Sequence, residues 1–496
     1  MVPKIFYYWS IGPADGAPFA EKGLRKLEDS QASGSIFARF DFYASYVKYL
    51  DIYGPKGETF KVLGWKVLTA RTRQKVLLPN LHTLTIRPTN APTDQLTMWV
   101  GTFSSPSLVN LLITDGNLWD ALTVSYWAAS SIMKSLAAAH PKLERLELFP
   151  SSELDDDYVD EGEDDSLVFP PGDPFYKYTE HFANLKRLAC TFAWFRGPAL
   201  RVLGQLPHLE ALDVCGIDKL GETSVELSED SFPSLRSLYL HYLSPTDARR
   251  TLKMTQMVRA LTSLRIDLNT EDLIYTHVNH ETRQAMREFF SLLLNVPHLT
   301  ALWIDLDPNG DLVEAVEIDK PDLGVLQPLP LKSLRLGQVF LSDDALQLNL
   351  ALVWPSVTRL SIPQQPASLA LLSRFAVLPE LLHLELQLNL DELELEYDKT
   401  ASALTVLQAS PDSSLCLNFS QAGQIIRALL NIFPNLTRMN WPSDQQSVRS
   451  DFEPAHEPKY EHISFMNGHR AALFKILVLE KARLVARSKA SESITF

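Results

Sequence analysis

The chain has 496 residues, of which 46% are hydrophobic and 21% are charged. This composition is that of a globular protein, yet a single compact core rarely grows beyond about 250–300 residues. Several domains or an array of repeats are the two common solutions, so internal periodicity is the first property to test.

The formal net charge of −14 is concentrated in one place. Residues 151–165 hold nine carboxylates and no basic residue, which leaves −14 + 9 = −5 for the rest of the chain. A body this mildly acidic gives no support for nucleic acid or an anionic membrane as a partner. The acidic run predicts a solvated insertion, and a docking segment for a basic partner is the alternative.

Cysteine usage and the N-terminus indicate the compartment. Cys190, Cys215 and Cys416 are few and far apart, so they predict neither a disulfide framework nor a paired metal site. Cys190 and Cys215 are expected to be packing thiols in or just after repeat strands. No signal-peptide pattern opens the sequence, and no run of about 18 apolar residues could span a membrane. We expect a cytoplasmic or nuclear protein.

One motif recurs along the chain: apolar, two variable residues, apolar, one variable residue, apolar. Thirteen copies begin at residues 47, 81, 108, 143, 185, 209, 235, 261, 299, 331, 357, 381 and 436. The shorter spacings of 24–27 residues are typical of leucine-rich repeats. The final gap of 55 residues is expected to hide an irregular unit near Ser414–Phe419.

The motif predicts an α/β leucine-rich-repeat solenoid. Its second and third apolar residues lie two apart on one face of a short strand, and stacking the units forms a parallel sheet over a continuous core. Thr282–Val296 and Gln421–Phe433 have the apolar spacing of amphipathic helices, and Ser244 and Ser342 have the pattern of helix N-caps. We expect an irregular horseshoe with the sheet on the concave face and helices on the convex face.

Three regions are predicted from these patterns. Residues 1–40 form an N-terminal flank or cap, and residues 41–442 form the solenoid, interrupted by the acidic insertion 151–165. Residues 443–496 form a C-terminal tail with a capping helix, because both ends of a repeat array need their apolar edges covered.

The segment IFARFDFYASYVKYLDI, Ile36–Ile52, resembles the lead-in to the first repeat of fungal F-box/leucine-rich-repeat proteins. The matching positions are Arg39, Phe40, Tyr43, Ala44, Val47, Leu50 and Ile52. The resemblance implies a substrate receptor of a ubiquitin ligase, in which a preceding F-box would dock a cullin-ligase adaptor. Residues 1–35 contain Gly- and Ser-rich stretches in place of three helices, so no intact F-box is recognised.

Catalytic motifs are absent from the sequence. It contains no GxSxG, GxxxxGK[ST], GxGxxG or HExxH pattern, and His277 and His280 lack a third ligand nearby. We therefore expect no catalytic residues, no metal and no cofactor, and a binding protein rather than an enzyme. A hydrolase-type enzyme with an unrecognised site, or a degenerate gene product without activity, are the alternatives.

The variable positions of the motif should project from the concave sheet face and contact a protein partner. Aromatic residues and arginine dominate interface energetics, and the middle repeats place them on neighbouring strands. The predicted partner-binding residues are Tyr239, His241, Arg265, Asp267, Trp303, Asp305 and Arg335.

Overall fold

The computed structural model describes residues 35–54, 70–88, 93–113, 123–139, 142–151, 173–216, 226–268, 287–306, 315–390, 400–411, 413 and 419–440. The chain divides into two compact units, Met1–Leu235 and Arg236–Phe496, here called unit 1 and unit 2. Within the described residues, no helix is long and apolar enough to cross a bilayer.

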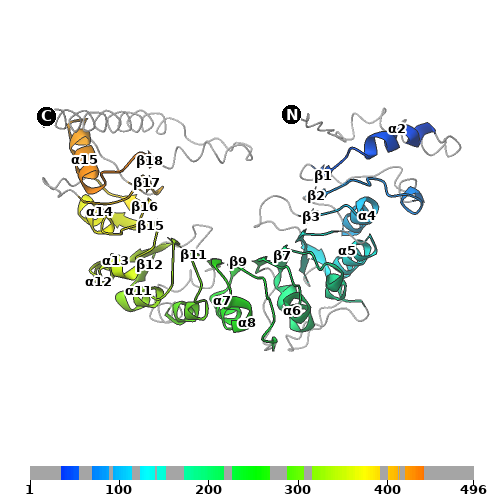
Figure 1. The fold of residues 1–496 in the computed structure, drawn as a ribbon, viewed down its shortest axis with the longest axis horizontal. Helices are drawn as coiled ribbons and strands as arrows, with labels where there is room; N and C mark the ends of the chain where they lie inside the picture. Colours follow the sequence, from blue (N-terminus) through cyan, green and yellow to red (C-terminus); the bar gives the residue numbers. More distant parts are fainter. Residues whose placement is uncertain are drawn as a thin grey trace, which may run out of the picture. The chain divides into compact units, whose positions relative to one another are not determined.

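Unit 1 contains a parallel sheet built from the first six repeat motifs (Figure 1). Its strands pair in chain order, and equivalent motif positions align, as Leu84 does with Leu111. The strands are β1 (Tyr49–Gly54), β2 (Thr83–Pro88), β3 (Asn110–Ile113), β5 (Arg145–Glu147), β7 (Arg187–Thr191) and β8 (Ala211–Cys215).

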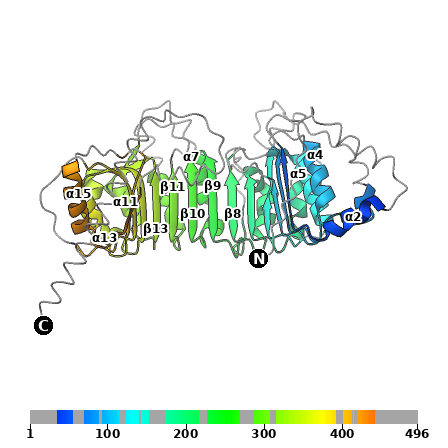
Figure 2. The ribbon, with the colours of Figure 1, turned by 90° about the horizontal axis from the view of Figure 1, so that it is seen from above.

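Unit 2 continues the same architecture with parallel strands that lie side by side in Figure 2. The strands are β9 (Ser237–Leu243), β10 (Ser263–Leu268), β11 (Ala301–Asp305), β13 (Ser333–Gly337), β15 (Arg359–Ala367), β16 (His383–Leu388), β17 (Val406–Ala409) and β18 (Arg438–Asn440). Thirteen of the strands in the two units coincide with the thirteen motifs, which confirms the repeat prediction.

The fourteenth strand, β17, corrects the position of the hidden repeat. The prediction placed it near Ser414–Phe419, but the strand is Val406–Ala409, preceded by the buried Leu404. Leu404, Leu407 and Ala409 occupy the three apolar positions of the motif and are buried. This copy of the motif is harder to recognise in the sequence, because its third apolar position is alanine and not a larger apolar residue.

Helices connect the strands and lie on one side of the sheet in each unit (Figure 1). Unit 1 has α2 (Ser35–Ala44), α4 (Thr93–Phe103), α5 (Tyr126–Ala139), η5 (Phe175–His181), η6 (Phe192–Phe195) and α6 (Gly197–Gly204), where η denotes a 3-10 helix. Unit 2 has α7 (Pro245–Leu252), α8 (Thr255–Val258), η7 (Leu293–Asn295), α11 (Lys320–Leu326), α12 (Asp343–Leu346), α13 (Leu350–Val353), α14 (Leu369–Phe375) and α15 (Phe419–Ile432).

The helix signals in the sequence agree with these bounds. Ser244 caps α7 by accepting a hydrogen bond from the Asp247 amide, and Ser342 caps α12 by accepting one from Ala345. Such caps satisfy amide groups that have no partner within the helix. Residues 287–292 are helical and end in η7, so the described part of the Thr282–Val296 prediction is confirmed, as is α15.

The apolar motif positions form the core between sheet and helices. In unit 2, the second motif residues of successive strands, such as Leu238, Leu264 and Leu302, are at most 2% exposed. Fully burying a leucine side chain stabilises a fold by about 1.5–3 kcal/mol, so a ladder of them makes each strand depend on its neighbours. The chain is thus a leucine-rich-repeat solenoid, with a parallel sheet backed by helices.

Two short parallel pairs add to the main strands and were not predicted. β4 (Thr123–Ser125) pairs with β6 (Phe149–Ser151), and β12 (Val316–Ile318) pairs with β14 (Val339–Leu341). Several sequence predictions lie outside the described residues: the acidic run beyond Ser151, the histidines at 277 and 280, Cys416, and the terminal segments 1–34 and 441–496.

Candidate partner-binding surface

The predicted binding residues of unit 2 occupy the neighbouring strands β9, β10, β11 and β13 (Figure 2). Register aligns Tyr239 with Arg265, Arg265 with Trp303, and Trp303 with Arg335. The residues on either side of each are buried leucines or isoleucines. Strand alternation therefore turns these four side chains to the sheet face opposite the core. We call them the stacked row.

The stacked row is a continuous pile of aromatic rings and guanidinium groups. The Arg265 guanidinium carbon lies 4.1 Å from the centroid of the Tyr239 ring and 4.0 Å from that of the Trp303 ring. Arg335 lies 4.5 Å from the Trp303 ring on the other side. Each cation–π contact contributes about 0.5–1 kcal/mol at exposed sites and more where water is excluded. Trp303 is therefore held in place before any partner arrives.

Asp267 anchors one end of the stacked row. Its carboxylate accepts hydrogen bonds from Arg265 at 3.1 and 3.2 Å and from the Tyr239 hydroxyl at 2.9 Å, and Nδ1 of His241 lies 3.3 Å away. Burial by itself would raise the pKa of Asp267, but the hydrogen bonds from His241, Arg265 and Tyr239 outweigh it and lower that pKa. The carboxylate therefore remains charged and fixes the first arginine of the row.

Two predicted contact residues have a different position from the one expected. Asp267 is 0% and His241 is 1% exposed, so neither offers its side chain to a partner. The physical reason is a bulge in β9: the register shifts between Ile266 and Leu268, and Tyr242 adopts a left-handed φ of 54°. The His241 ring packs against the Tyr239 ring, with centroids 3.2 Å apart. Asp267 and His241 therefore hold the side chains of the stacked row in place without being exposed themselves.

Asp305 and Gly337 are neighbours in the next row of the same face. A Cβ atom at position 337 would lie 2.7 Å from the carboxylate of Asp305, so glycine allows that side chain to lie over the strand. Asp305 is half-buried, and its carboxylate lies beside the stacked row rather than within it.

Replacing Gly337 with alanine is expected to lower the free energy of unfolding by about 1 kcal/mol, the low end of the cost of overpacking, because the carboxylate can rotate away. A double-mutant cycle with Asp305→Ala, measured by urea denaturation, tests the cause. The alanine at 337 should cost almost nothing once Asp305 is removed. An unchanged cost in that background would show that the close approach is not the reason for glycine.

Three residues that the sequence reasoning missed extend the row beyond Arg335. Arg335 donates to Oε2 of Glu385 at 3.1 Å, Ser361 donates to the same atom at 2.5 Å, and Gln408 donates to Oε1 at 2.9 Å. Ser361, Glu385 and Gln408 occupy the motif position equivalent to Arg335 in the next three strands. The motif itself identifies this position for Ser361 and Glu385. Gln408 lies in β17, the repeat whose position was not predicted correctly, so its equivalence could not be recognised from the sequence.

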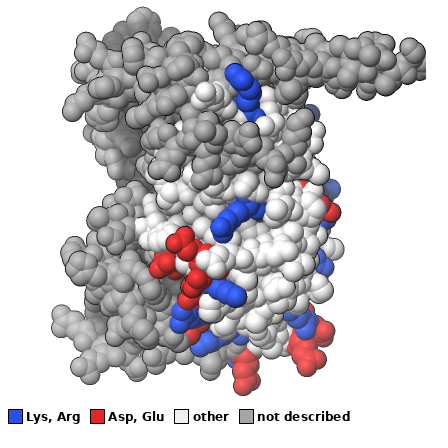
Figure 3. Space-filling model, turned by 90° about the vertical axis from the view of Figure 1, so that its left-hand side faces the viewer, with Lys and Arg blue, Asp and Glu red and all other residues white. Residues whose placement is uncertain are grey.

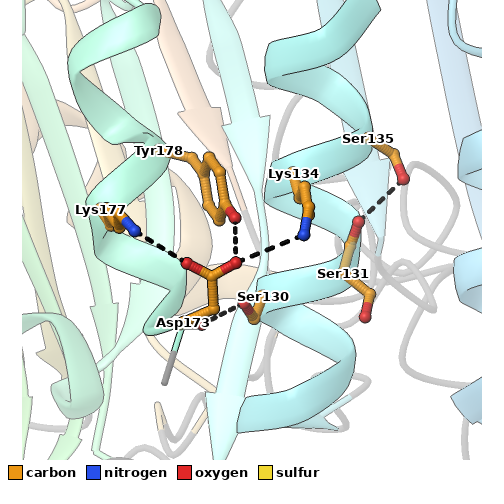
Figure 4. Close-up of polar contacts among 7 residues, drawn as sticks. All are labelled: Ser130, Ser131, Lys134, Ser135, Asp173, Lys177 and Tyr178. Carbon is orange, nitrogen blue, oxygen red and sulfur yellow. Dashed lines mark hydrogen bonds and ion pairs between the residues drawn. The ribbon is translucent and has the colours of Figure 1, made fainter.

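In unit 1 the polar cluster of Figure 4 lies among helices. The carboxylate of Asp173 accepts hydrogen bonds from Tyr178, Lys177 and Lys134, and the hydroxyl of Ser130 donates to its backbone oxygen. These bonds lower the pKa of Asp173 to about 2, the Tyr178 hydroxyl being the largest contributor, and raise that of Tyr178 to about 12. The cluster fastens η5 to α5, and its charges already have partners.

Unit 1 also contains two buried thiols, as the sequence predicts. Cys190 and Cys215 are 0% and 3% exposed. Burial raises the pKa of Cys190 well above its ordinary value, and Asp213 adds to the effect. A thiol of this kind is a packing group and a poor nucleophile. Among the described residues no group of three His, Cys, Asp or Glu side chains could hold a metal ion.

The side of the molecule that lies on the left in Figure 1, at the α14 and α15 end, is shown in Figure 3. On its described surface acidic and basic side chains lie close to one another, and most of that surface carries neither kind. Opposite charges are also paired between helices of unit 2, where Arg249 lies 2.6 Å from Glu288. Balanced charges of this kind keep a surface soluble, so they do not mark it as a docking site.

No protein-family model matches the chain. No curated protein matches it. Similar solved structures include the complex of TLR13 with ssRNA13, at 15% identity and a TM-score of 0.30, covering 74% of this chain and 53% of that one. The chain thus spans about half the length of that protein.

A second similar structure is an internalin, inlF, from Listeria monocytogenes. It is 14% identical, with a TM-score of 0.33, and the match covers 88% of this chain and 95% of the internalin. The repeat architecture of this chain follows from its own strand order and register.

Proposed function

We propose that this protein binds a protein partner on the sheet face of unit 2, through the stacked row of Tyr239, Arg265, Trp303 and Arg335. The observation that carries the proposal is Trp303, half-buried between two guanidinium groups at 4.0 and 4.5 Å. Tryptophan, tyrosine and arginine are the residues most enriched among those that dominate binding energy. Because the stack is already ordered, its own side chains lose little entropy when a partner binds.

The finer form of the proposal is a substrate receptor related to F-box components of ubiquitin ligases, acting in the cytoplasm or nucleus. The likeness of Ile36–Ile52 to the lead-in segment of that family supports it, and these residues form α2 and β1. The buried thiols Cys190 and Cys215 are consistent with a reducing compartment. A cullin-ligase adaptor among the copurified proteins is the expected result for this form. A client bound without an adaptor would leave only the general binding role.

Trp303→Ala should remove most of the bound partner, because truncating a central interface tryptophan costs about 2–4 kcal/mol, or roughly 30- to 1,000-fold in affinity. The measurement is quantitative mass spectrometry after affinity purification of the full chain from its native cells. Trp127→Ala is the matched control, since Trp127 is 62% exposed on α5 and belongs to unit 1. Thermal melting of both variants confirms that each is folded. Equal recovery of the same partners by the two variants would contradict the proposal.

A further inference from the structure

A second row of side chains on the same face of unit 2 carries positive charge. Arg359, His383, Val406 and Arg438 are aligned by register on the neighbouring strands β15, β16, β17 and β18. Each lies two residues before the position that continues the stacked row, so strand alternation places the two rows on the same sheet face. We call Arg359, His383 and Arg438 the cationic row.

The two arginines of the cationic row are exposed and have no counter-ion among the described residues. Among the described residues no carboxylate pairs with Arg359, and Arg438 donates to a neutral acceptor, Oδ1 of Asn440, at 2.7 Å. Glu385, which lies on the same face two residues after His383, is already bound by Arg335, Ser361 and Gln408. By contrast, Arg145, Arg265 and Arg335 of the other strands each have a carboxylate partner.

The pKa of His383 reflects the positive charges of the two arginines. Burial is the main cause that lowers its pKa, and the charges of Arg359 and Arg438 lower it further, against the opposing effects of Gln408 and Glu385. Both guanidinium groups therefore act on one site between them. An anionic ligand that spans this row would be attracted by both arginines.

The spacing of the row limits the shape of its ligand. Arg359 and Arg438 are three strands apart, a separation of about 14 Å at roughly 4.8 Å per strand. An extended peptide advances about 3.4 Å per residue, so two acidic side chains four positions apart span the same distance. The half-buried Val406 lies between the two cations and offers an apolar contact to the intervening residues.

We propose that the cationic row binds an acidic, extended segment of the protein partner, with Asp or Glu side chains about four residues apart contacting Arg359 and Arg438. The inference rests on the proposed function, because it assigns the chemistry of the partner that also contacts Trp303. A nucleic acid fits less well, because its affinity depends on neutralising several phosphates and the row supplies only two exposed arginines.

The test uses the full chain and a fluorescein-labelled peptide of twelve residues, made of Gly, Ser and Ala with two glutamates four positions apart. Fluorescence anisotropy should show saturable binding that weakens as salt is added. Arg359→Glu/Arg438→Glu should weaken the affinity at least tenfold. The control is Arg201→Glu/Lys253→Glu, which changes the net charge equally at exposed positions of α6 and the end of α7 and should leave the affinity within about twofold.

Each other outcome overturns the proposal: no saturable binding by the glutamate peptide, an equal loss in the control variant, binding only of the phosphoserine version of the peptide, or preferential binding of oligouridylate. A second readout is the NMR titration of the His383 ring, whose pKa should rise when the peptide binds. Trp303→Ala separates the two proposals. Retained peptide binding in that variant, with loss of the natural partner, leaves both intact. Loss of peptide binding in the row variant while Trp303→Ala keeps its partner refutes the stacked row alone.

Discussion

Replacing Asp267 with alanine is expected to lower the free energy of unfolding by about 3 kcal/mol. Removing one partner of a buried charge pair costs about 3–5 kcal/mol, and the lower end applies because the Arg265 side chain is 32% exposed. The substitution leaves the Arg265 guanidinium, the Tyr239 hydroxyl and His241 without their common acceptor. The measurement is urea denaturation followed by circular dichroism.

The matched control is Asp51→Ala on β1. Asp51 pairs with Arg87 at 3.6 Å, but the two side chains are 54% and 37% exposed. A solvent-exposed ion pair contributes about 0–1 kcal/mol, so this variant should be almost as stable as the parent. Equal losses in the two variants would mean that burial of the carboxylate is not what makes Asp267 important.

The stabilisation by Asp267 should depend on pH with a definite sign. The pKa of this carboxyl is lowered in the folded protein, so the folded state binds fewer protons than the unfolded chain. Its contribution is therefore fully present above the unfolded value of about 3.9 and is lost as pH falls through the lower, folded value. The stability difference between the parent and Asp267→Asn should be constant near neutral pH and shrink below about pH 4. A difference that grew on acidification would contradict this assignment.

Trp194→Ala should cost about 3–5 kcal/mol, the usual result of truncating a buried tryptophan. Trp194 is fully buried in η6 of unit 1, and its ring centroid lies 4.8 Å from that of Phe175, which in turn packs against Tyr126 at 5.7 Å. The three rings join η6, η5 and the start of α5 in one core. Removing the indole at one end of this chain of rings leaves a cavity in the core.

Trp194→Phe is the informative companion variant, again followed by urea denaturation. The indole Nε1 of Trp194 is buried and has no hydrogen-bond partner among the described residues. Phenylalanine keeps an aromatic ring in the core and removes that unsatisfied donor, so the loss should be well under half of that for alanine. Equal losses for the two variants would indicate that an unrecognised bond to Nε1, rather than packing, stabilises this core.

The sequence was most informative where structure depends on local spacing. Alternation along a strand is a property of the backbone, so Leu264 and Ile266 of the motif identify the buried side of β10 and leave Arg265 on the other. The same alternation and the motif spacing align Tyr239, Arg265, Trp303 and Arg335 on one face. Capping by Ser244 was equally local, because hydroxyl and amide lie three residues apart.

Contacts between strands are not local, and there the sequence was less informative. Nothing in the residues around His241 predicts the bulge of β9, because it depends on how β9 pairs with β10. Without the bulge His241 and Asp267 were assigned to the surface, whereas the fold buries both. Likewise, which arginine pairs with a carboxylate depends on register over several strands. Glu385 pairs with Arg335 from two strands away, and Arg359 on the intervening strand has no counter-ion in the part of the chain that the structure describes.

The sequence by itself thus determined the repeat, the buried side of each strand and the four members of the stacked row. The reason is that strand alternation and motif spacing depend only on the separation of residues along the chain. Only the tertiary structure decided which polar side chains are buried, which charges are neutralised and where the fourteenth strand lies. These properties follow from the pairing of strands that are distant along the chain, as are Arg359 and His383, which are 24 residues apart. The free energy of such pairs depends on burial and neighbours rather than on sequence position.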